Sequence, residues 1–240
     1  MNNVLQHNKL KKALTYLEKR DDSNKLNYIK LWKTNFSHYL YNFSKRFLDI
    51  SISLVSLILL SPILVLTSIF IKLTDGGPVL YWSNRVGVKG KIFHFPKFRS
   101  MIFNADTKLQ HLKKLNKHGE NDITFKIKND PRITFVGKWI RRFSIDELPQ
   151  LWCVLIGSMT LVGPRPPIPD EVKSYTLKER HRLDIKPGIT CIWQVSGRAD
   201  IPFPKQMLLD LEYVQKRSFK LDLILLLKTI PAVISGKGAY

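Results

Sequence analysis

ISISLVSLILLSPILVLTSIFI, residues 50–71, is the stretch that decides the class of this 240-residue chain, because its 22 residues carry no charge. An apolar run of this length matches the thickness of a bilayer core. It starts too late in the chain for a removable signal peptide, and no small-residue cleavage site follows it. The alternative is a buried helix of a soluble protein, which seldom needs so long an uninterrupted run. The run therefore predicts a membrane protein.

Ser61 and Pro62 lie in the middle of this run. A proline removes one backbone hydrogen bond and clashes with the preceding turn, so the helix is expected to kink or break there. The hydroxyl of Ser61 can satisfy a backbone group that the break frees. The pair predicts a helix-break-helix segment.

The charges on the two flanks favour a re-entrant course for this segment. Residues 1–49 carry ten Lys/Arg and four Asp/Glu, and residues 72–240 carry 29 and 15. Both flanks are net positive, and basic flanks prefer the cytoplasm. A segment that enters and leaves by the same leaflet keeps both inside, whereas a straight span would place one outside. Because proline kinks also occur in spanning helices, a straight span remains the alternative.

The overall composition narrows the partners. The chain is 44% hydrophobic and 24% charged, enough for the core of one good-sized domain. The net charge of +20 favours nucleic acid, an anionic membrane or nucleotide-like substrates. Two distant cysteines, Cys153 and Cys191, exclude a disulfide-rich scaffold and a zinc cluster built on CxxC pairs. The chain contains no HExxH, GxSxG, P-loop or GxGxxG motif.

The chain is expected to have three parts: a basic N-terminal extension (1–44), the re-entrant helix (45–73) and a cytoplasmic domain (74–240). In the extension, residues 9–20 have helical spacing and a basic face, which suits a surface-seeking or a plain solvated helix. The fold class is α+β and mostly helical. The elements expected in the domain are a hairpin of strands 79–82 and 91–95 around a turn at 87–90, a basic helix over 104–118, a rigid loop over 163–169 and an amphipathic helix over 205–217. The last expected element is an interfacial or packed helix over 221–235. Lys228 and Pro231 interrupt its apolar sequence too much for a membrane span.

The segment RRFSIDELPQ, residues 141–150, carries two adjacent carboxylates after two arginines. Pro149 lacks an N–H and is comfortable only in a first helical turn, which places the helix start near Asp146. There the helix dipole stabilises the carboxylate and an incoming phosphate. Such a carboxylate can bind Mg²⁺ or act as a nucleophile toward phosphorus. The alternative is a plain capping box, with Ser144 as N-cap and Glu147 closing it.

Basic residues beside stiff backbone predict a diphosphate pocket. Prolines on both sides of Arg165 hold its guanidinium in place for bidentate binding of phosphate, although a turn with this arginine in water is the alternative. Lys97 and Arg99 after the hairpin, Lys186 before Pro-Gly, and Arg198 after Ser-Gly repeat the theme.

Several motifs in register then carry a family resemblance. They are KRFLD (45–49), Ser61-Pro62, KFRSM (97–101), NDPRIT (129–134), the stretch 144–151 with Asp146-Glu147, LVGPRP (161–166), KPGIT (186–190) and WQVSGR (193–198). Over residues 45–240 the chain resembles the bacterial sugar transferases, which are monotopic polyprenyl-phosphate phosphoglycosyl transferases.

The resemblance implies transfer of a phosphosugar from a UDP-sugar to undecaprenyl phosphate, with release of UMP, at the cytoplasmic face of the bacterial inner membrane. It implies that Asp146 is the nucleophile and holds Mg²⁺. It also implies that Glu147 positions this nucleophile or handles protons. Arg141 and Arg165 match phosphate-contacting positions, and Lys97, Arg99, Lys186 and Arg198 are expected to complete the phosphate and nucleotide site.

The resemblance extends to the membrane and to the pathway. Ser61-Pro62 matches the break of the re-entrant helix, and Arg46 and Asp49 match positions at the membrane boundary. The implied product starts exopolysaccharide, capsule, lipopolysaccharide O-antigen or glycan assembly. Anionic lipids are expected partners, nucleic acid is not, and a homo-oligomer is left open.

Three departures from the family pattern lie outside the carboxylate pair. Ile145 stands where Leu is usual, Cys153 where Asn is expected, and Cys191-Ile192 where Gly-Leu is usual. A competing hypothesis is a membrane-anchored basic module that binds anionic polymer without chemistry. Two carboxylates in the basic pocket argue against it, because a pure anion binder gains nothing from them.

Overall fold

The computed structural model describes residues 35–105 and 130–238 of the chain. The chain divides into two compact units, residues 1–45 and 46–240, and the described elements of the site belong to the second. The helix expected over 9–20 and most of the one expected over 104–118 lie outside the described residues. The boundaries of the three expected parts stay a prediction.

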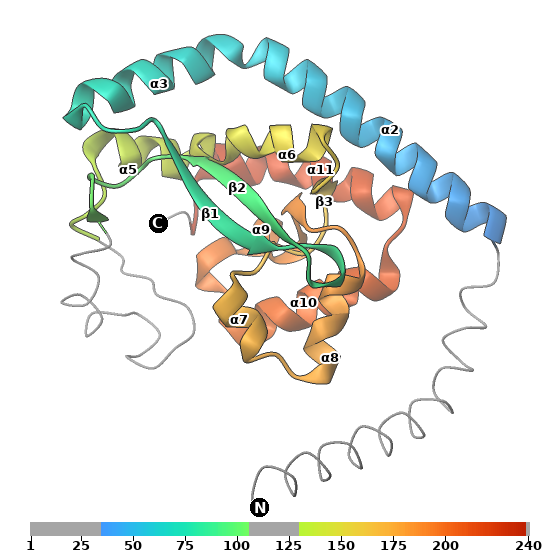
Figure 1. Ribbon diagram of the computed structural model, residues 1–240. Helices are drawn as coiled ribbons and strands as arrows, with labels where there is room; N and C mark the ends of the chain where they lie inside the picture. Colours follow the sequence, from blue (N-terminus) through green and yellow to red (C-terminus); the bar gives the residue numbers. More distant parts are fainter. Residues whose placement is uncertain (1–34, 106–129, 239–240) are drawn as a thin grey trace, which may run out of the picture. The chain divides into compact units, whose positions relative to one another are not determined.

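The fold is mostly helical with a small antiparallel hairpin, as expected (Figure 1). Strands β1 (Leu80–Val86) and β2 (Ile92–Phe98) pair with Tyr81 opposite Lys97 and Val86 opposite Ile92. Both strands are longer than predicted, because pairing continues up to the tight turn that joins them.

A second, parallel pair joins β3 (Thr160–Val162) to β4 (Gly188–Thr190), which the sequence analysis did not predict. Strands of three residues are too short to display an alternation of polar and apolar side chains. The two backbone segments approach so closely here that a Cβ on Gly188 would lie 2.1 Å from the backbone nitrogen of Gly163. Glycine is therefore required for this crossing.

In the described part of the chain the larger hydrophobic cluster contains Phe95, Val154, Met159 and Tyr213, and a smaller one contains Ile71, Phe98 and Ile140. The predicted helices over 205–217 and 221–235 are confirmed as α10 (Phe203–Lys216) and α11 (Phe219–Ser235). The non-helical loop before Pro169 is also confirmed. The remaining helices and 3-10 turns of the second unit are η1 (Val88–Gly90), α5 (Phe135–Arg142), η4 (Ile145–Gln150), α6 (Leu151–Leu155), α7 (Pro169–Lys173), α8 (Leu177–Arg180), η5 (His181–Asp184), α9 (Ile192–Ser196), η6 (Arg198–Asp200), α10 (Phe203–Lys216) and α11 (Phe219–Ser235).

The long apolar run folds as two helices. They are α2 (Asn35–Leu59) and α3 (Ser61–Asp75), bent by 59° at the break (Figure 1). Among the described residues no single helix has the length and apolar composition of a membrane span, and α2 with α3 meets that requirement only as a bent pair. The predicted break is confirmed, and the re-entrant course stays a prediction.

The chemistry of the break follows from Ser61 and Pro62. Pro62 has no N–H for the carbonyl of Ile58, four residues earlier. Ser61 Oγ donates to that same carbonyl at 2.8 Å. Backbone bonding resumes when Leu64 N donates to Leu60 O at 2.9 Å. The prediction that Ser61 satisfies a backbone group freed by the proline is confirmed.

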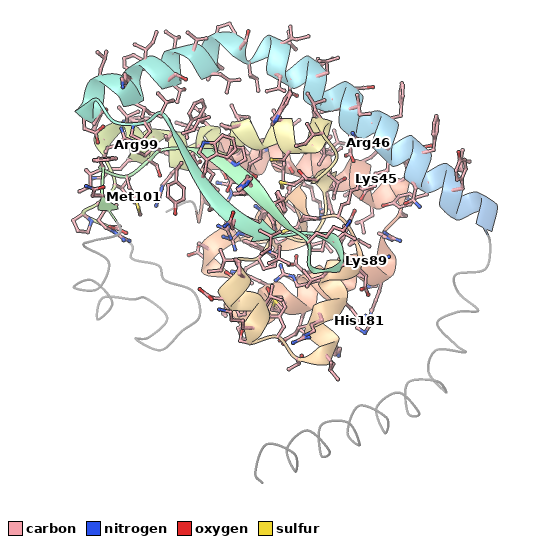
Figure 2. All side chains as sticks on the ribbon, viewed as in Figure 1. Lys45, Arg46, Lys89, Arg99, Met101 and His181 are labelled. Atoms are coloured by element: carbon pink, nitrogen blue, oxygen red, sulfur yellow. The ribbon has the colours of Figure 1, made fainter. Side chains whose placement is uncertain are left out.

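Both flanks of the apolar run are attached to the same domain. Before the run, Arg46 donates to two carbonyls of α6 at 2.6 and 2.7 Å, and buried Asp49 accepts from Thr160 Oγ1 at 2.7 Å. After the run, Asp75 forms an ion pair with buried Arg99. Figure 2 shows Arg46 beside the middle of α2 and Arg99 near the end of α3. The apolar run is therefore held to one body on both of its flanks.

Candidate active site

A cleft of about 890 Å³ opens beside the hairpin. Strands β1 and β2, the turn η4, helix α9 and the loop Gly163–Ile168 all contribute to its lining. We call this loop the PRP loop, after Pro164-Arg165-Pro166. The residues that the sequence singled out and that line the cleft are Lys97, Arg99, Arg141, Asp146, Glu147, Arg165 and Arg198.

Lys186 is the one predicted phosphate-binding residue that the structure places elsewhere. Its ammonium lies close to Gly157, where an added Cβ would be 3.5 Å from both Lys186 Nζ and Arg46 Nη2. Lys186 thus belongs with Arg46 and Asp49, which lie in the middle of α2. Its binding of the phosphate in the cleft finds no support in this position.

The carboxylates Asp146 and Glu147 reach the cleft through a sharp backbone reversal. Helix α5 ends at Arg142, and Ser144 then adopts the left-handed region with φ of 55°, which is uncommon for a residue other than glycine. Glu147 N donates to Ser144 O at 3.2 Å and starts the 3-10 turn η4. Asp146 is 8% exposed in the first turn of η4.

This geometry decides between the two helix starts that the sequence allowed. Ser144 precedes η4, but its side chain makes no cap hydrogen bond, so the capping box with Glu147 is wrong. Asp146 lies in the first turn, as predicted. Pro149 falls within η4, before α6 begins at Leu151, so its missing N–H lies outside the α-helix.

The two carboxylates have different electrostatic surroundings. Lys97 Nζ on β2 forms an ion pair with Glu147 Oε1 at 2.6 Å. Burial alone would raise the pKa of Glu147, but Lys97, Arg165 and Arg198 lower it below its ordinary value. Burial raises the pKa of Asp146 to about 6, although Lys97 opposes the shift. The pair therefore combines a carboxylate of fixed charge with one that titrates near neutral pH.

Arg141 and Arg198 surround Asp146 with positive charge. Arg141 Nε donates to Ser100 Oγ at 2.8 Å, which fixes its guanidinium beside the carboxylates. Arg198 has a left-handed φ of 53°, and its buried Nη1 has no hydrogen-bond partner among the described residues. An arginine with an unused buried N–H is suited to an incoming phosphate oxygen.

Arg99 differs, because its charge is already matched by Asp75 and its side chain is 8% exposed. Its guanidinium also packs against Gly77, where a Cβ would lie 2.2 Å from Nη1. The structure therefore gives Arg99 the place of a tether at the end of α3, and its predicted contact with phosphate stays a prediction.

A buried network supports the PRP loop from behind. Arg182 Nη2 donates to Arg165 O at 2.8 Å and forms an ion pair with Asp210. Trp193, which lines the cleft, donates from Nε1 to Asp210 Oδ1 at 3.1 Å. The network joins two walls of the cleft, so the position of Arg165 depends on residues that do not face the substrate.

Sequence reasoning missed three residues of this site. Arg85 faces the cleft with Tyr81 and Ser83, and the alternation of a longer β1 could have identified it. Glu171 is buried 3.7 Å from Arg165, and its place three residues after Ile168, at the start of α7, was an available signal. Arg182 lies in a short 3-10 turn with no local motif that marks it.

The donor set can be compared with the needs of Mg²⁺. The described residues contain no group of three His, Cys, Asp or Glu side chains that could hold a metal. Mg²⁺ is commonly bound by one or two carboxylates, with substrate phosphates and water as the other ligands. Asp146 fits this mode, because among the described residues its carboxylate has no ion-pair partner within 4 Å while Glu147 is paired with Lys97.

Comparison with known proteins places the chain in a family. The model of the family described as "Bacterial sugar transferase" matches residues 40–236. The chain belongs to the bacterial sugar transferase family. The resemblance on which the sequence analysis relied is therefore confirmed, and the noncatalytic module is disfavoured.

Three relatives of this sugar transferase have informative names. The exopolysaccharide production protein ExoY of Sinorhizobium fredii is 41% identical over 199 residues, 82% of this chain and 88% of the relative. An undecaprenyl-phosphate galactose phosphotransferase of Salmonella typhimurium is 42% identical over 87% of the chain and 44% of its own length. An undecaprenyl-phosphate glucose phosphotransferase of Komagataeibacter xylinus is 37% identical over 82% and 37%. The chain thus spans most of the first relative and under half of the other two.

Proposed function

We propose that this sugar transferase moves a phosphosugar from a UDP-sugar to undecaprenyl phosphate and releases UMP. The observation that carries the proposal is the position of Asp146. It is a buried carboxylate in a cleft whose other charged side chains are mostly basic, and its partner Glu147 is already neutralised by Lys97 at 2.6 Å. The names of two relatives, which are undecaprenyl-phosphate phosphotransferases, support the acceptor.

The proposed reaction has two balanced halves. A carboxylate oxygen of Asp146 attacks the phosphorus that bears the sugar, and the bond from this phosphorus to the bridging oxygen breaks, so that UMP leaves with the electron pair. The phosphosugar is then held as a mixed anhydride on Asp146. A phosphate oxygen of the lipid attacks the same phosphorus, and Asp146 leaves as a carboxylate. The product is a lipid diphosphate sugar.

The surrounding side chains serve this chemistry in different ways. Arg141 and Arg198 stabilise the charge that develops on the attacked phosphate. Glu147 holds Lys97 through an ion pair at 2.6 Å and keeps its negative charge beside the nucleophile, whose position it helps to set. Mg²⁺ bound at Asp146 would offset the negative charge of the diphosphate. The raised pKa of Asp146 still leaves most of its carboxylate ionised above pH 7, which a nucleophile requires.

The lipid acceptor needs an enzyme at the membrane surface. The helix pair α2–α3 exposes large apolar side chains, among them Leu54, Ile58, Phe70 and Leu73. Both flanks of its apolar run are attached to one domain, which agrees with entry and exit by the same leaflet and disagrees with a straight span. We therefore propose a re-entrant anchor, with the cleft at the cytoplasmic face of the inner membrane and anionic lipids around the basic surface.

The place in metabolism follows from the product. A sugar diphosphate on a polyprenyl carrier is a starting unit, so this step begins the assembly of exopolysaccharide, capsule, O-antigen or another glycan. The name of the ExoY relative points to exopolysaccharide.

The direct experiment is release of UMP from a panel of UDP-sugars. Full-length enzyme in lipid nanodiscs is given Mg²⁺ and a short polyprenyl phosphate. We expect one donor to give sustained UMP release, and Asp146→Asn to give none. Asp170→Asn, which removes an exposed carboxylate on α7, is the matched control and should behave as wild type. Absence of UMP from every donor would overturn the proposed function.

A further inference from the structure

Arg85 is a basic residue of the cleft that the proposed mechanism does not use. It follows Tyr81 and Ser83 on the face of β1 that lines the cleft. Its guanidinium lies 5.1 Å from the centroid of the Phe95 ring, and Lys97 Nζ lies 5.5 Å from the same centroid. Arg85 and Lys97, the lysine that pairs with Glu147, therefore both lie next to the ring of Phe95.

Two hydrogen bonds join the end of β1 to the PRP loop. Arg85 Nη1 donates to Pro166 O at 3.2 Å, and Val86 N donates to Pro167 O at 2.9 Å. These contacts hold Arg85 beside Arg165, whose own carbonyl is held by Arg182. The guanidinium of Arg85 and the backbone of Arg165 are therefore held at the same stretch of loop, which lowers the ordering cost for a ligand that both residues contact.

The donors of Arg85 are largely unused. A guanidinium has five N–H groups, and the described residues provide one hydrogen-bond acceptor, Pro166 O, at 3.2 Å. Its Nε is buried without a hydrogen-bond partner among those residues. Burial and the neighbouring Arg165 lower the pKa of Arg85 to about 10. Glu171 lies 3.7 Å from Arg165 and its charge also acts on Arg85, so two adjacent guanidiniums share one carboxylate. The excess of positive charge is one that an anion would relieve.

The site has two positively charged sides. Arg141 interacts more with the charge of Asp146, where the attacked phosphorus must lie, than with that of Glu147. Arg198 interacts with both carboxylates and with Glu147 more strongly. Arg165 and Arg85 interact with Glu147. A donor diphosphate has two phosphates, so the second phosphate is expected on the side of Glu147.

We propose that Arg85 and Arg165 together bind the phosphate that stays with the departing nucleotide. The ligand class is a nucleoside phosphate, bound through its phosphate by two guanidiniums. This inference rests on the proposed function for the identity of the nucleotide, but the phosphate site itself can be probed with inorganic pyrophosphate.

The alternative is that Arg85 only holds the PRP loop in place. A variant series separates the two roles through the affinity for UMP and for pyrophosphate, measured by calorimetry on the full-length enzyme. We expect Arg85→Gln to weaken both about 10- to 100-fold, the usual value of a charge-assisted hydrogen bond, and Arg85→Lys to restore part of the loss. Lys91→Gln, which removes an exposed positive charge from the same hairpin, is the matched control and should have no effect.

The decisive comparison uses the Arg165→Gln background. If Arg85 contacts phosphate directly, Arg85→Gln weakens pyrophosphate binding further in that background. If Arg85 only positions Arg165, nothing remains to position and the second substitution has no effect, which would overturn the proposal. Thermal unfolding of each variant controls for misfolding.

The probes also separate this inference from the proposed function. Wild-type enzyme that binds pyrophosphate through Arg85 but does not bind UMP would keep the phosphate site and contradict a uridine nucleotide as the donor. Wild-type enzyme that binds neither probe would overturn the phosphate site.

Discussion

Asp146 and Glu147 are adjacent in the chain, yet the fold places them in different electrostatic surroundings. The reversal at Ser144 buries Asp146 and turns Glu147 toward Lys97, which comes from a strand 50 residues earlier. A carboxylate that is buried but not ion-paired is less well solvated and is a stronger nucleophile than one held by a lysine. The division of roles between the two residues follows from this difference.

The titration of Asp146 is the first prediction. In metal-free enzyme, carbon-13 NMR of the carboxyl groups should show a midpoint near pH 6 for Asp146. Glu147→Gln removes a repelling charge and should lower that midpoint. Lys97→Gln removes an attracting charge and should raise it. Equal midpoints in all three proteins would show that these neighbours do not set the charge of Asp146.

The same burial has a consequence for stability. The pKa of Asp146 is about 6 in the folded protein and 3.8 ordinarily, so folding stability falls as pH rises from about 4 to 6. Asp146→Asn should therefore raise the free energy of unfolding at pH 7.5 by about 1–3 kcal/mol in EDTA, since one pKa unit is worth about 1.4 kcal/mol. The gain should vanish below pH 4. Chemical denaturation at both pH values checks this, and a less stable variant at pH 7.5 would contradict it.

The sequence predicts the residues of the site that sit in local motifs and misses those that approach from elsewhere. Asp146, Glu147 and Arg165 stand out because an acidic pair and a proline-flanked arginine are readable within a few positions. Arg182 is invisible in this way, because its contacts with Arg165 and Asp210 span 17 and 28 residues. Lys186 shows the reverse error. Its position before Pro187-Gly188 predicted a phosphate contact, but the residue lies outside the cleft.

At the scale of elements, the break between α2 and α3 is the best-explained feature. Its two causes, a missing N–H and a hydroxyl that replaces it, are both local and were predictable. The β3–β4 pair was not, because its strands are short and their pairing depends on the close approach of Gly163 and Gly188.

Pro62→Ala tests the break. The alanine restores an N–H for Ile58 O, so the two helices should straighten, and the 22 uncharged residues would reach roughly 33 Å at 1.5 Å per residue, enough to cross a bilayer core. We expect part of the population to place its N-terminus outside, with loss of activity. Ser61→Ala is the companion variant, because it removes the replacement hydroxyl and keeps the proline. Unchanged topology in Pro62→Ala would mean that the tethers at Asp49 and Asp75, and not the proline, set the bend.

At the scale of the whole molecule, the proposed re-entrant anchor places both of its flanks on one side of the membrane. Both native cysteines are buried, so an introduced cysteine can be labelled selectively. Asn42→Cys and Lys91→Cys place exposed thiols before and after the anchor. In intact cells both should resist an impermeant maleimide and react once the cells are opened. Labelling of residue 42 alone from outside would establish a straight span.

The central claim is that Asp146 forms a covalent bond to the phosphosugar, and quenched-reaction mass spectrometry without acceptor tests it most directly. Enzyme mixed with UDP-sugar and Mg²⁺ should release about one UMP per active site, and a peptide containing Asp146 should gain the mass of one phosphosugar. Double-reciprocal plots for the complete reaction should run parallel. If the lipid phosphate attacks the donor directly while Asp146 only holds Mg²⁺, no UMP forms before acceptor arrives, the peptide keeps its mass and the plots intersect. That combination would contradict the covalent mechanism.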